Sequence, residues 1–189
     1  MLTIVDDKLM VAHPIPGGYS FTLASRLGQL INRAEAAYGP RDRSYTILGV
    51  EFREGVPQVW FPADCNHVVI QLGHTALQDP TQALFQLAHE CIHLLDPRSG
   101  GSNRLEEGLA TVFSIDYLAD ELHVRDYHPT DPRYVTAASL VRELLAVHSD
   151  GPKLIREHHG ALGRATAEQI RGICPKLSPE TAPKLAEPL

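Results

Sequence analysis

The sequence predicts an α+β fold, in which a small antiparallel or mixed sheet packs on a helix and a mainly helical half follows. Three observations lead to this fold class. Strand-like segments gather between residues 45 and 72, helix start signals recur after residue 79, and 43% of the 189 residues are hydrophobic, which suits one compact core. We therefore expect a single domain over residues 1–174 and a Pro-rich flexible tail over residues 175–189.

The first half of the chain is expected to supply one helix and the strands. Hydrophobic residues recur at spacings of three and four after Ser20, and Gly39-Pro40 ends this helical pattern. Three segments then have the composition and spacing of strands: residues 45–52, 56–61 and 67–72. These segments are expected to form the small sheet.

Start signals predict the helices of the second half. Asp79-Pro80 begins a helix that should run to about Leu95. The next helix, capped by Asn103, is apolar almost all round and therefore belongs inside the fold. Further helices are expected to begin near three later positions: Asp131-Pro132, Pro152 and Thr166.

Charge and composition argue against several classes of function. Lysine and arginine number 17 against 23 acidic residues, a net charge of −6, and no basic stretch could follow a phosphate backbone, so nucleic acid is not an expected partner. We find no apolar run long enough to cross a bilayer and no signal-peptide pattern at the N-terminus. Cys65, Cys91 and Cys174 show no paired spacing. A soluble, cytoplasmic protein is expected, with Cys91 facing the core.

Two histidines four residues apart point to metal chemistry. His89 and His93 belong to a His-Glu-x-x-His pattern on the helix that begins after Asp79, so both side chains stand on one face about one turn apart. They lie in a polar stripe on an otherwise apolar helix, and such a stripe needs a partner that a cation would supply. Neutral imidazole nitrogens suit Zn²⁺ and leave room for a third protein ligand and a water. Glu90 could take the proton of that water. The alternative is a helix with two idle histidines.

The third ligand is expected from the next helix, where Glu106 and Glu107 are adjacent and cannot both face the metal. Glu106 lies three residues after Asn103, so its side chain is expected to reach back to the backbone of this cap. Glu107 is therefore the better ligand. Small residues follow it on the same face, and Thr111 could hydrogen-bond the coordinating carboxylate. The alternative for Glu107 is a favourable charge at the positive end of the helix dipole.

The His-Glu-x-x-His pattern at residues 89–93, followed by Glu107-Gly-Leu-Ala, resembles the gluzincin metallopeptidases. The resemblance covers roughly residues 45–120. It implies a zincin-like fold, Zn²⁺ at His89, His93 and Glu107, and Glu90 as general base and acid. The chain looks like a minimal member, because the stretch between the second histidine and the glutamate is short.

The same resemblance implies a substrate-binding strand and an oxyanion-stabilising group. In gluzincins the strand just before the active-site helix often holds an extended peptide by backbone pairing, which here assigns substrate binding to Val68, Val69 and Ile70. A tyrosine, histidine or arginine further along usually stabilises the oxyanion. No motif selects this residue among four candidates, Tyr117, Tyr127, His128 and Tyr134. Tyr134 is the working assignment.

These features predict a zinc-dependent hydrolase of peptide bonds that acts on a peptide or protein substrate, as an endopeptidase or an aminopeptidase. Two alternatives stay open. One is a small protease that cleaves a single dedicated regulator, such as a repressor. The other is a zincin-shaped interaction module without efficient catalysis.

Overall fold

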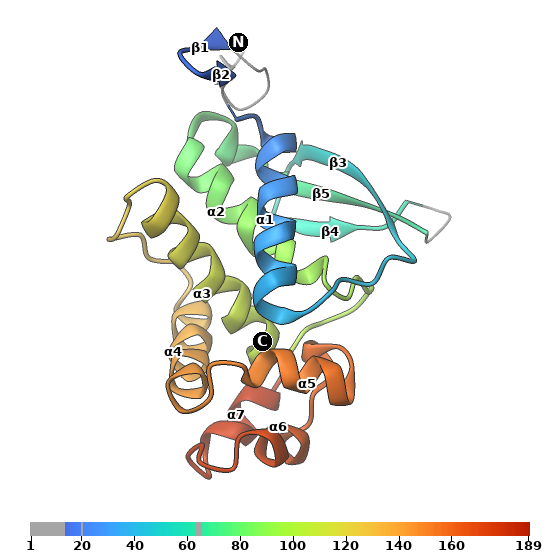
Figure 1. Cartoon of the computed structure of the whole chain (residues 1–189), viewed down its shortest axis with the longest axis vertical. Coiled ribbons are helices and arrows are strands. Elements are labelled where there is room, and N and C mark those ends of the chain that lie inside the picture. Colours follow the sequence, from blue (N-terminus) through green and yellow to red (C-terminus); the bar gives the residue numbers. More distant parts are fainter. Residues whose placement is uncertain (1–13, 20, 63–65) are drawn as a thin grey trace.

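The computed structural model describes residues 14–19, 21–62 and 66–189. Over these residues the chain has the α+β architecture expected from the sequence, with a small mixed sheet and a mostly helical remainder (Figure 1). In chain order the elements are β1 (Pro14–Ile15), β2 (Gly18–Tyr19), α1 (Leu23–Tyr38), β3 (Thr46–Arg53), β4 (Gln58–Trp60), β5 (His67–Gly73), the 3₁₀ turn η2 (His74–Gln78), α2 (Pro80–His93), α3 (Arg104–Glu121), α4 (Pro132–Val147), α5 (Gly151–His159), the 3₁₀ turn η3 (Leu162–Arg164), α6 (Ala167–Ile173) and α7 (Thr181–Ala186).

The three-stranded sheet has β5 in its centre, in the order β3-β5-β4. β3 runs parallel to β5 and β4 runs antiparallel to it, so the sheet is mixed rather than purely antiparallel. β3 and β4 follow one another along the chain, but β5 lies between them. Within the described part of the chain, the backbone of β5 is therefore paired on both sides, whereas β4 forms an edge of the sheet.

The helices begin at the start signals that the sequence predicts. Asp79 accepts a hydrogen bond from the backbone N–H of Gln82 at 3.0 Å, and Pro80 occupies the first position of α2. The same side-chain capping is found for α3, α4 and α6, at Asn103, Asp131 and Thr166. α1 is capped by Thr22, while Ser20, from which the helical pattern was counted, lies outside the described residues.

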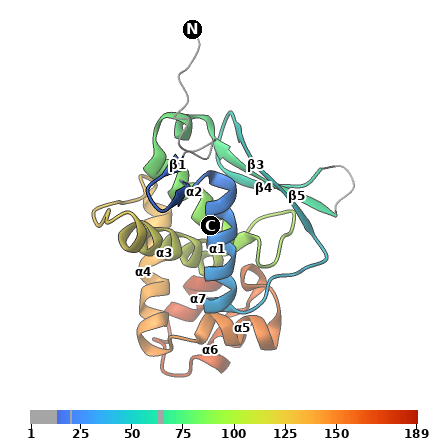
Figure 2. The same ribbon diagram turned by 45° about the horizontal axis from the view of Figure 1, so that its top comes forward.

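The helices stack in layers on the sheet. α1 and α2 pack against the strands, α3 packs on α2, and α4 packs on α3 (Figures 1 and 2). α5, α6 and α7 lie at the end of this stack away from β1 and β2. The largest fully buried side chains include Leu30, Ile70, Leu72, Leu87, Ile92, Leu105, Leu109, Tyr117, Leu118, Leu144 and Ile155. α2 is thus enclosed between the sheet and α3, so a polar group on its inner faces must find a partner there.

The C-terminal segment is folded, which corrects the expectation of a flexible tail over residues 175–189. α7 buries Ala182 and Leu185, and the backbone N–H of Leu189 donates to the carbonyl of Ser102 at 3.2 Å. The proline content misled the prediction. Pro183 lies in the first turn of α7, where a missing N–H costs no intrahelical hydrogen bond. The apolar positions could therefore pack despite the prolines.

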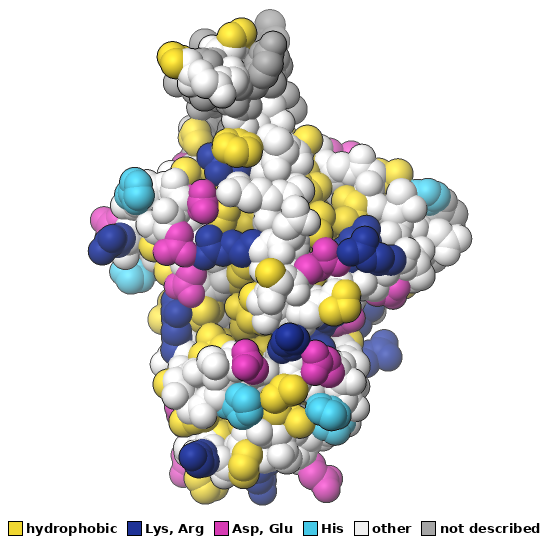
Figure 3. Space-filling view, in the orientation of Figure 1, with side chains coloured by type: hydrophobic (Ala, Val, Ile, Leu, Met, Phe, Trp, Pro, Cys, Tyr) yellow, Lys and Arg dark blue, Asp and Glu magenta, His cyan; other side chains and the backbone are white. Residues whose placement is uncertain are grey.

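Charged side chains of both signs lie intermixed on the face shown in Figure 3, where α1 meets α3 and around α5. No helix among the described residues is long and apolar enough to cross a bilayer.

Cys91 faces the core, as expected, and is 1% exposed. Cys65 lies outside the described residues.

Candidate metal centre

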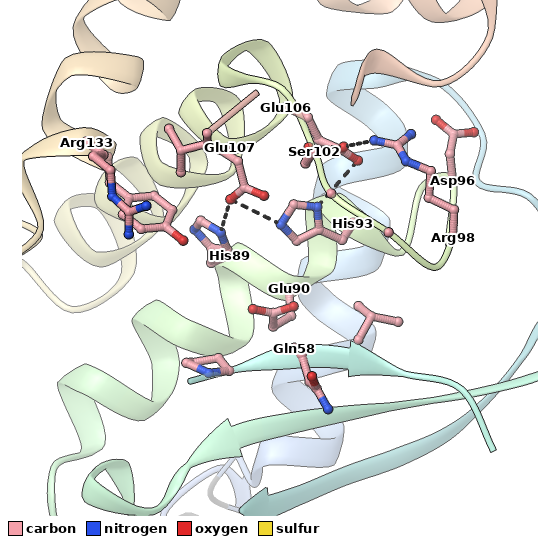
Figure 4. Close-up of a pocket in the computed structure, with 16 residues that line it drawn as sticks. Gln58, His89, Glu90, His93, Asp96, Arg98, Ser102, Glu106, Glu107 and Arg133 are labelled. Carbon is pink, nitrogen blue, oxygen red and sulfur yellow. Dashed lines mark hydrogen bonds and ion pairs between the residues drawn. The ribbon is translucent and has the colours of Figure 1, made fainter. Parts of the chain in front are cut away.

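Two neighbouring helices bring His89, His93 and Glu107 together. His89 and His93 lie one turn apart at the C-terminal end of α2, and Glu107 lies in the first turn of α3. One ligand atom from each side chain lies within 4.8 Å of the other two, so among the described residues this group could hold a metal ion. Figure 4 shows the carboxylate of Glu107 directed between the two imidazole rings.

The distances within this trio fit a small tetrahedral cation. Nε2 of His89 lies 3.1 Å from Oε2 of Glu107, and Nε2 of His93 lies 3.6 Å from the same oxygen. Ligand atoms that each bind Zn²⁺ at roughly 2.0–2.1 Å stand about 3.3 Å apart at the corners of a tetrahedron. Two imidazole nitrogens and one carboxylate oxygen also form a donor set that zinc accepts. The residues present therefore fit a metal ion of this kind.

Close packing around α3 brings Glu107 to this position. A Cβ on Gly108 would overlap the backbone carbonyl of Ala137, so the glycine after the ligand lets α4 pack directly on α3. The sequence suggested that Thr111 would hydrogen-bond the Glu107 carboxylate, but it does not. Its hydroxyl donates to the backbone carbonyl of Glu107 at 2.8 Å, since a threonine inside a helix reaches the carbonyl four residues earlier.

The charges around the trio favour the protonated form of His93 and the ionised form of Glu107. Burial alone would lower the pKa of His93, but its contacts with Glu106 and Glu107 raise that pKa well above 6.5. Burial would raise the pKa of Glu107, but hydrogen bonds with His89 and His93 lower it. A positive charge between these side chains is therefore strongly stabilised.

Glu90 lies beside the trio, as the motif predicts for a general base. Its side chain is almost completely buried, and Figure 4 shows it between the histidines and β4. Burial raises the pKa of this carboxyl, and the nearby Glu107 and Glu106 raise it further, against the opposing effect of His93 and His89. A carboxyl with a raised pKa is suited to taking up a proton near neutral pH.

Glu106 does not make the contact expected from the sequence. The side chain of Asn103 caps α3 by accepting from the backbone N–H of Glu106 at 3.0 Å, as predicted. However, the side chain of Glu106 turns into the protein, where Oε2 accepts from the Ser102 hydroxyl and the Arg98 guanidinium. Its Oε1 lies 3.4 Å from Nδ1 of His93. Sequence reasoning missed Arg98 and Ser102, because nothing in their spacing indicates that the loop after α2 folds back onto α3.

Two hollows flank the histidines and share Pro57, His89, Glu90, Arg133 and Tyr134. We call the first, of about 300 Å³, the polar hollow; its further lining comes from β4, the 98–102 loop, His93, Glu106, Glu107, Asp96 and Leu189. We call the second, of about 460 Å³, the apolar hollow; its further lining includes Val56, Phe85, Tyr127 and Pro129. Together they form a cleft that runs past Glu90.

The residues expected to bind substrate do not line this cleft. Val68, Val69 and Ile70 are buried in β5, and this central strand has no free backbone edge. The edge strand β4 lines the polar hollow through Gln58 and Val59, and Pro57, just before this strand, lines both hollows. In Figure 4 the side-chain amide of Gln58 points away from Glu90, and it donates to Gln71 on β5 at 2.7 Å. The prediction was wrong because strand order is not chain order here, so the strand next to α2 in sequence is not the strand at the cleft.

Of the four candidates for oxyanion stabilisation, Tyr134 lies nearest the trio. Its ring meets that of His89 edge-on, with the ring centroids 5.6 Å apart, and it lines both hollows. Burial, together with the carboxylates of Glu107 and Glu90, raises its pKa to about 12, so the hydroxyl keeps its proton as a hydrogen-bond donor.

The other three candidates lie elsewhere. Tyr127 lines the apolar hollow and stacks on Phe85, with ring centroids 4.5 Å apart. The Tyr117 hydroxyl accepts a hydrogen bond from Arg26 on α1, at 3.2 Å. His128 is exposed and lines neither hollow. Sequence reasoning did not single out Arg133, which lines both hollows, although its position beside Tyr134 was a usable signal.

No protein-family model, curated protein or solved structure matches this chain. Its functional assignment therefore depends on the geometry of the trio and on the motif that carries it.

Proposed function

We propose that this protein is a zinc-dependent hydrolase of peptide bonds, with the metal held by His89, His93 and Glu107. One observation carries the proposal: two imidazole nitrogens and one carboxylate oxygen converge at the spacing of tetrahedral ligands, with the buried carboxyl of Glu90 beside them. If the two histidines had no function, this spacing and the second buried carboxyl at the wall of the cleft would be unexplained.

The side chains around the trio have chemically distinct tasks in this reaction. Bound zinc would supply a Lewis acid that lowers the pKa of water and polarises a carbonyl group. Glu90 accepts the proton from the attacking water and later delivers it to the leaving amine, for which its raised pKa is suited. Tyr134 keeps its proton and is the group that could donate to the developing oxyanion.

The order of the elements supports a zincin-like, gluzincin-type arrangement. A small sheet precedes the helix with the two histidines, and the helix with the glutamate follows it. β4 rather than β5 would hold an extended peptide, because its free backbone edge lies along the cleft. The apolar hollow, with Phe85 and Tyr127, would receive an apolar side chain of the substrate.

Metal analysis of the purified protein tests the first half of the proposal. The wild type should carry about one zinc per chain, and His93→Ala should lose it. His158→Ala is a matched control, since His158 is an exposed histidine on α5, outside the trio. A wild type that folds without binding zinc, even when zinc is supplied, would overturn the proposal.

Glu90→Gln tests the second half. The amide keeps the size of the side chain but cannot accept the proton, so zinc binding should persist while hydrolysis of a mixed peptide library falls at least 100-fold. If the zinc-loaded wild type cleaves no peptide in such a library, the interaction module replaces the hydrolase as the better hypothesis.

A further inference from the structure

Glu106 is a buried carboxylate that touches the metal trio without belonging to it. It is 4% exposed, and its two oxygens face different partners. Oε2 accepts from the Arg98 guanidinium and from the Ser102 hydroxyl. Oε1 lies 3.4 Å from Nδ1 of His93. Both oxygens are thus engaged away from the point where the ligand atoms of the trio converge, as Figure 4 shows.

The ring of His93 is oriented by two acidic neighbours. Its Nδ1 faces Glu106, and its Nε2 lies 3.6 Å from the carboxylate of Glu107. A neutral imidazole carries one N–H, and only the other nitrogen has a lone pair for a metal. Donation from Nδ1–H to Glu106 therefore leaves Nε2 free on the side of the trio.

The position of Glu106 is fixed from the far side by the turn η3. A Cβ added at Gly163 in this turn would overlap the Arg98 guanidinium and the Glu106 carboxylate, so the backbone of η3 lies directly over their ion pair. The side chain of Asn103 joins this turn to the start of α3, because its amide donates to the carbonyl of Leu162 at 2.9 Å. A chain of contacts thus leads from η3 through Arg98 and Glu106 to His93.

We propose that Glu106 is a positioning residue for the metal ligand His93, and that Gly163 is required because it lets Arg98 and Glu106 pair beneath η3. The inference rests on the proposed metal site and adds to it residues that are not ligands. Glu106 selects the nitrogen of His93 that binds the metal, and Arg98 with Ser102 keeps Glu106 from turning towards the metal itself.

Glu106→Gln tests the direct contact. The amide keeps the volume of the side chain. Its oxygen should stay with the donors Arg98 and Ser102, so its nitrogen would face Nδ1–H of His93 and cannot accept a hydrogen bond from it. Zinc affinity, measured by competition with a chromogenic chelator, should fall about 10-fold to 100-fold, as is usual when the partner of a metal-bound histidine is lost. In the ¹H–¹⁵N spectrum of the zinc-loaded wild type, His93 should show an Nδ1–H protected from exchange, and this protection should be lost in the variant.

Gly163→Ala tests the chain of contacts from η3 through Arg98 and Glu106 to His93 without changing a residue of the trio. If Glu106→Gln does not fold, this variant alone decides whether Glu106 positions His93. The glycine has an ordinary backbone conformation, so alanine adds only the methyl group that displaces the ion pair. Zinc affinity should again fall about 10-fold. Gly172→Ala is the matched control, because a Cβ at Gly172 meets nothing within 4 Å. It should bind zinc like the wild type.

The outcomes separate this inference from the proposed function. Wild-type zinc affinity and an unchanged His93 signal in both Glu106→Gln and Gly163→Ala overturn the inference and leave the zinc site intact. A wild type that binds no zinc overturns the proposed function and, with it, the role of Glu106. Weaker zinc binding in Gly172→Ala equal to that in Gly163→Ala also overturns the role of this chain of contacts, because the effect would then come from any added methyl group in this region.

Discussion

The described chain has two clusters of charged side chains on α3, and they differ in burial and in charge balance. At the C-terminal end of α3, Asp120 and Glu121 pair with Arg26 and Arg33 of α1 in a surface cluster with two charges of each sign. At the N-terminal end, Glu106 and Glu107 meet Glu90 of α2 in a buried cluster with Arg98 as its guanidinium partner. Asp96, which also lines the polar hollow, is paired separately with Arg156.

The difference between these clusters indicates what the buried one lacks. Three carboxylates against one guanidinium leave a deficit of two positive charges, which is the charge of a divalent cation. Without a cation, protons compensate, since the pKa values of Glu90 and His93 are both raised. The surface cluster is balanced in charge, and its side chains are 18–60% exposed. A buried cluster deficient in positive charge, beside two histidines, is therefore the part of α3 to test for metal binding.

Of the variants considered, Glu107→Ala should have the largest effect, on the gain in stability that zinc gives to the buried cluster. Zinc at 1,000 times its dissociation constant stabilises the wild type by roughly 4 kcal/mol against unfolding, and the variant should lose most of this gain. Asp120→Ala, in the surface cluster, should keep it in full. Thermal melts with zinc and with a chelator measure the gain for each protein. An equal zinc-dependent shift in the Glu107 variant and in the wild type would remove Glu107 from the site.

Arg98→Met should have the next largest effect, on stability without zinc. The guanidinium neutralises the 4% exposed carboxylate of Glu106, and removing it leaves this buried charge with only the Ser102 hydroxyl and His93, which it shares with Glu107, at a cost of about 3 kcal/mol. Arg142→Met breaks an exposed pair with Asp116 and should cost less than about 1 kcal/mol. Urea unfolding of the two variants measures both costs. Equal costs would mean that Glu106 is not buried as a charge.

The sequence was sufficient to predict that His89, His93 and Glu107 come together, because the signals involved are local. Helical periodicity puts His89 and His93 on one face, and the caps at Asp79 and Asn103 mark where the two helices begin, so the histidines and Glu107 could be related by counting residues. Such signals depend only on residues within one or two helical turns.

The partners of the site could not be found in this way, because they depend on contacts between distant segments. Gly163 lies over Arg98 although 65 residues separate them in the chain, and the cleft is lined by β4 because β5 is inserted between β3 and β4. The same applies to the segment after Cys174, whose prolines suggested a tail although Leu185 is buried. The order of the strands and the path of the loop after α2 are set by packing of the whole core rather than by local spacing.

Zinc binding should release protons and weaken as the pH falls. Since the pKa of His93 is raised well above 6.5, the metal-free protein holds a proton there at neutral pH, and a metal can bind the ring only after that proton leaves. Apparent affinity should fall up to tenfold, about 1.4 kcal/mol, for each pH unit below this raised pKa. Calorimetry at pH 7 in two buffers of different ionisation enthalpy measures the protons released.

The metal-free protein should show the opposite trend in the contribution of His93 to stability. A raised pKa in the folded state contributes stability that is complete below the ordinary value of 6.5 and is lost as the pH rises through the folded value. The lowered pKa of Glu107 contributes stability above 4.5 that is lost on acidification. Both contributions are therefore complete between the ordinary pKa values of 4.5 and 6.5. The stabilisation by zinc should be largest at higher pH, where His93 has lost its proton. Zinc affinity that does not change with pH would show that no proton of the trio is displaced.

The response to salt should give the smallest effect and separates the two clusters most directly. In the surface cluster the Asp120 side chain is 60% exposed, so Arg33→Met should cost about 0.5 kcal/mol in low salt and nearly nothing in 0.5 M NaCl, where charges are screened over a few ångströms. The cost of Arg98→Met should change much less between the two salt concentrations, because the side chains of this pair are only 15% and 5% exposed and salt screens buried pairs less than exposed ones. Urea unfolding at two salt concentrations distinguishes the cases. A cost of Arg98→Met that falls with salt as steeply as that of Arg33→Met would show that the buried cluster is screened like the surface cluster, which would contradict the need for a bound cation.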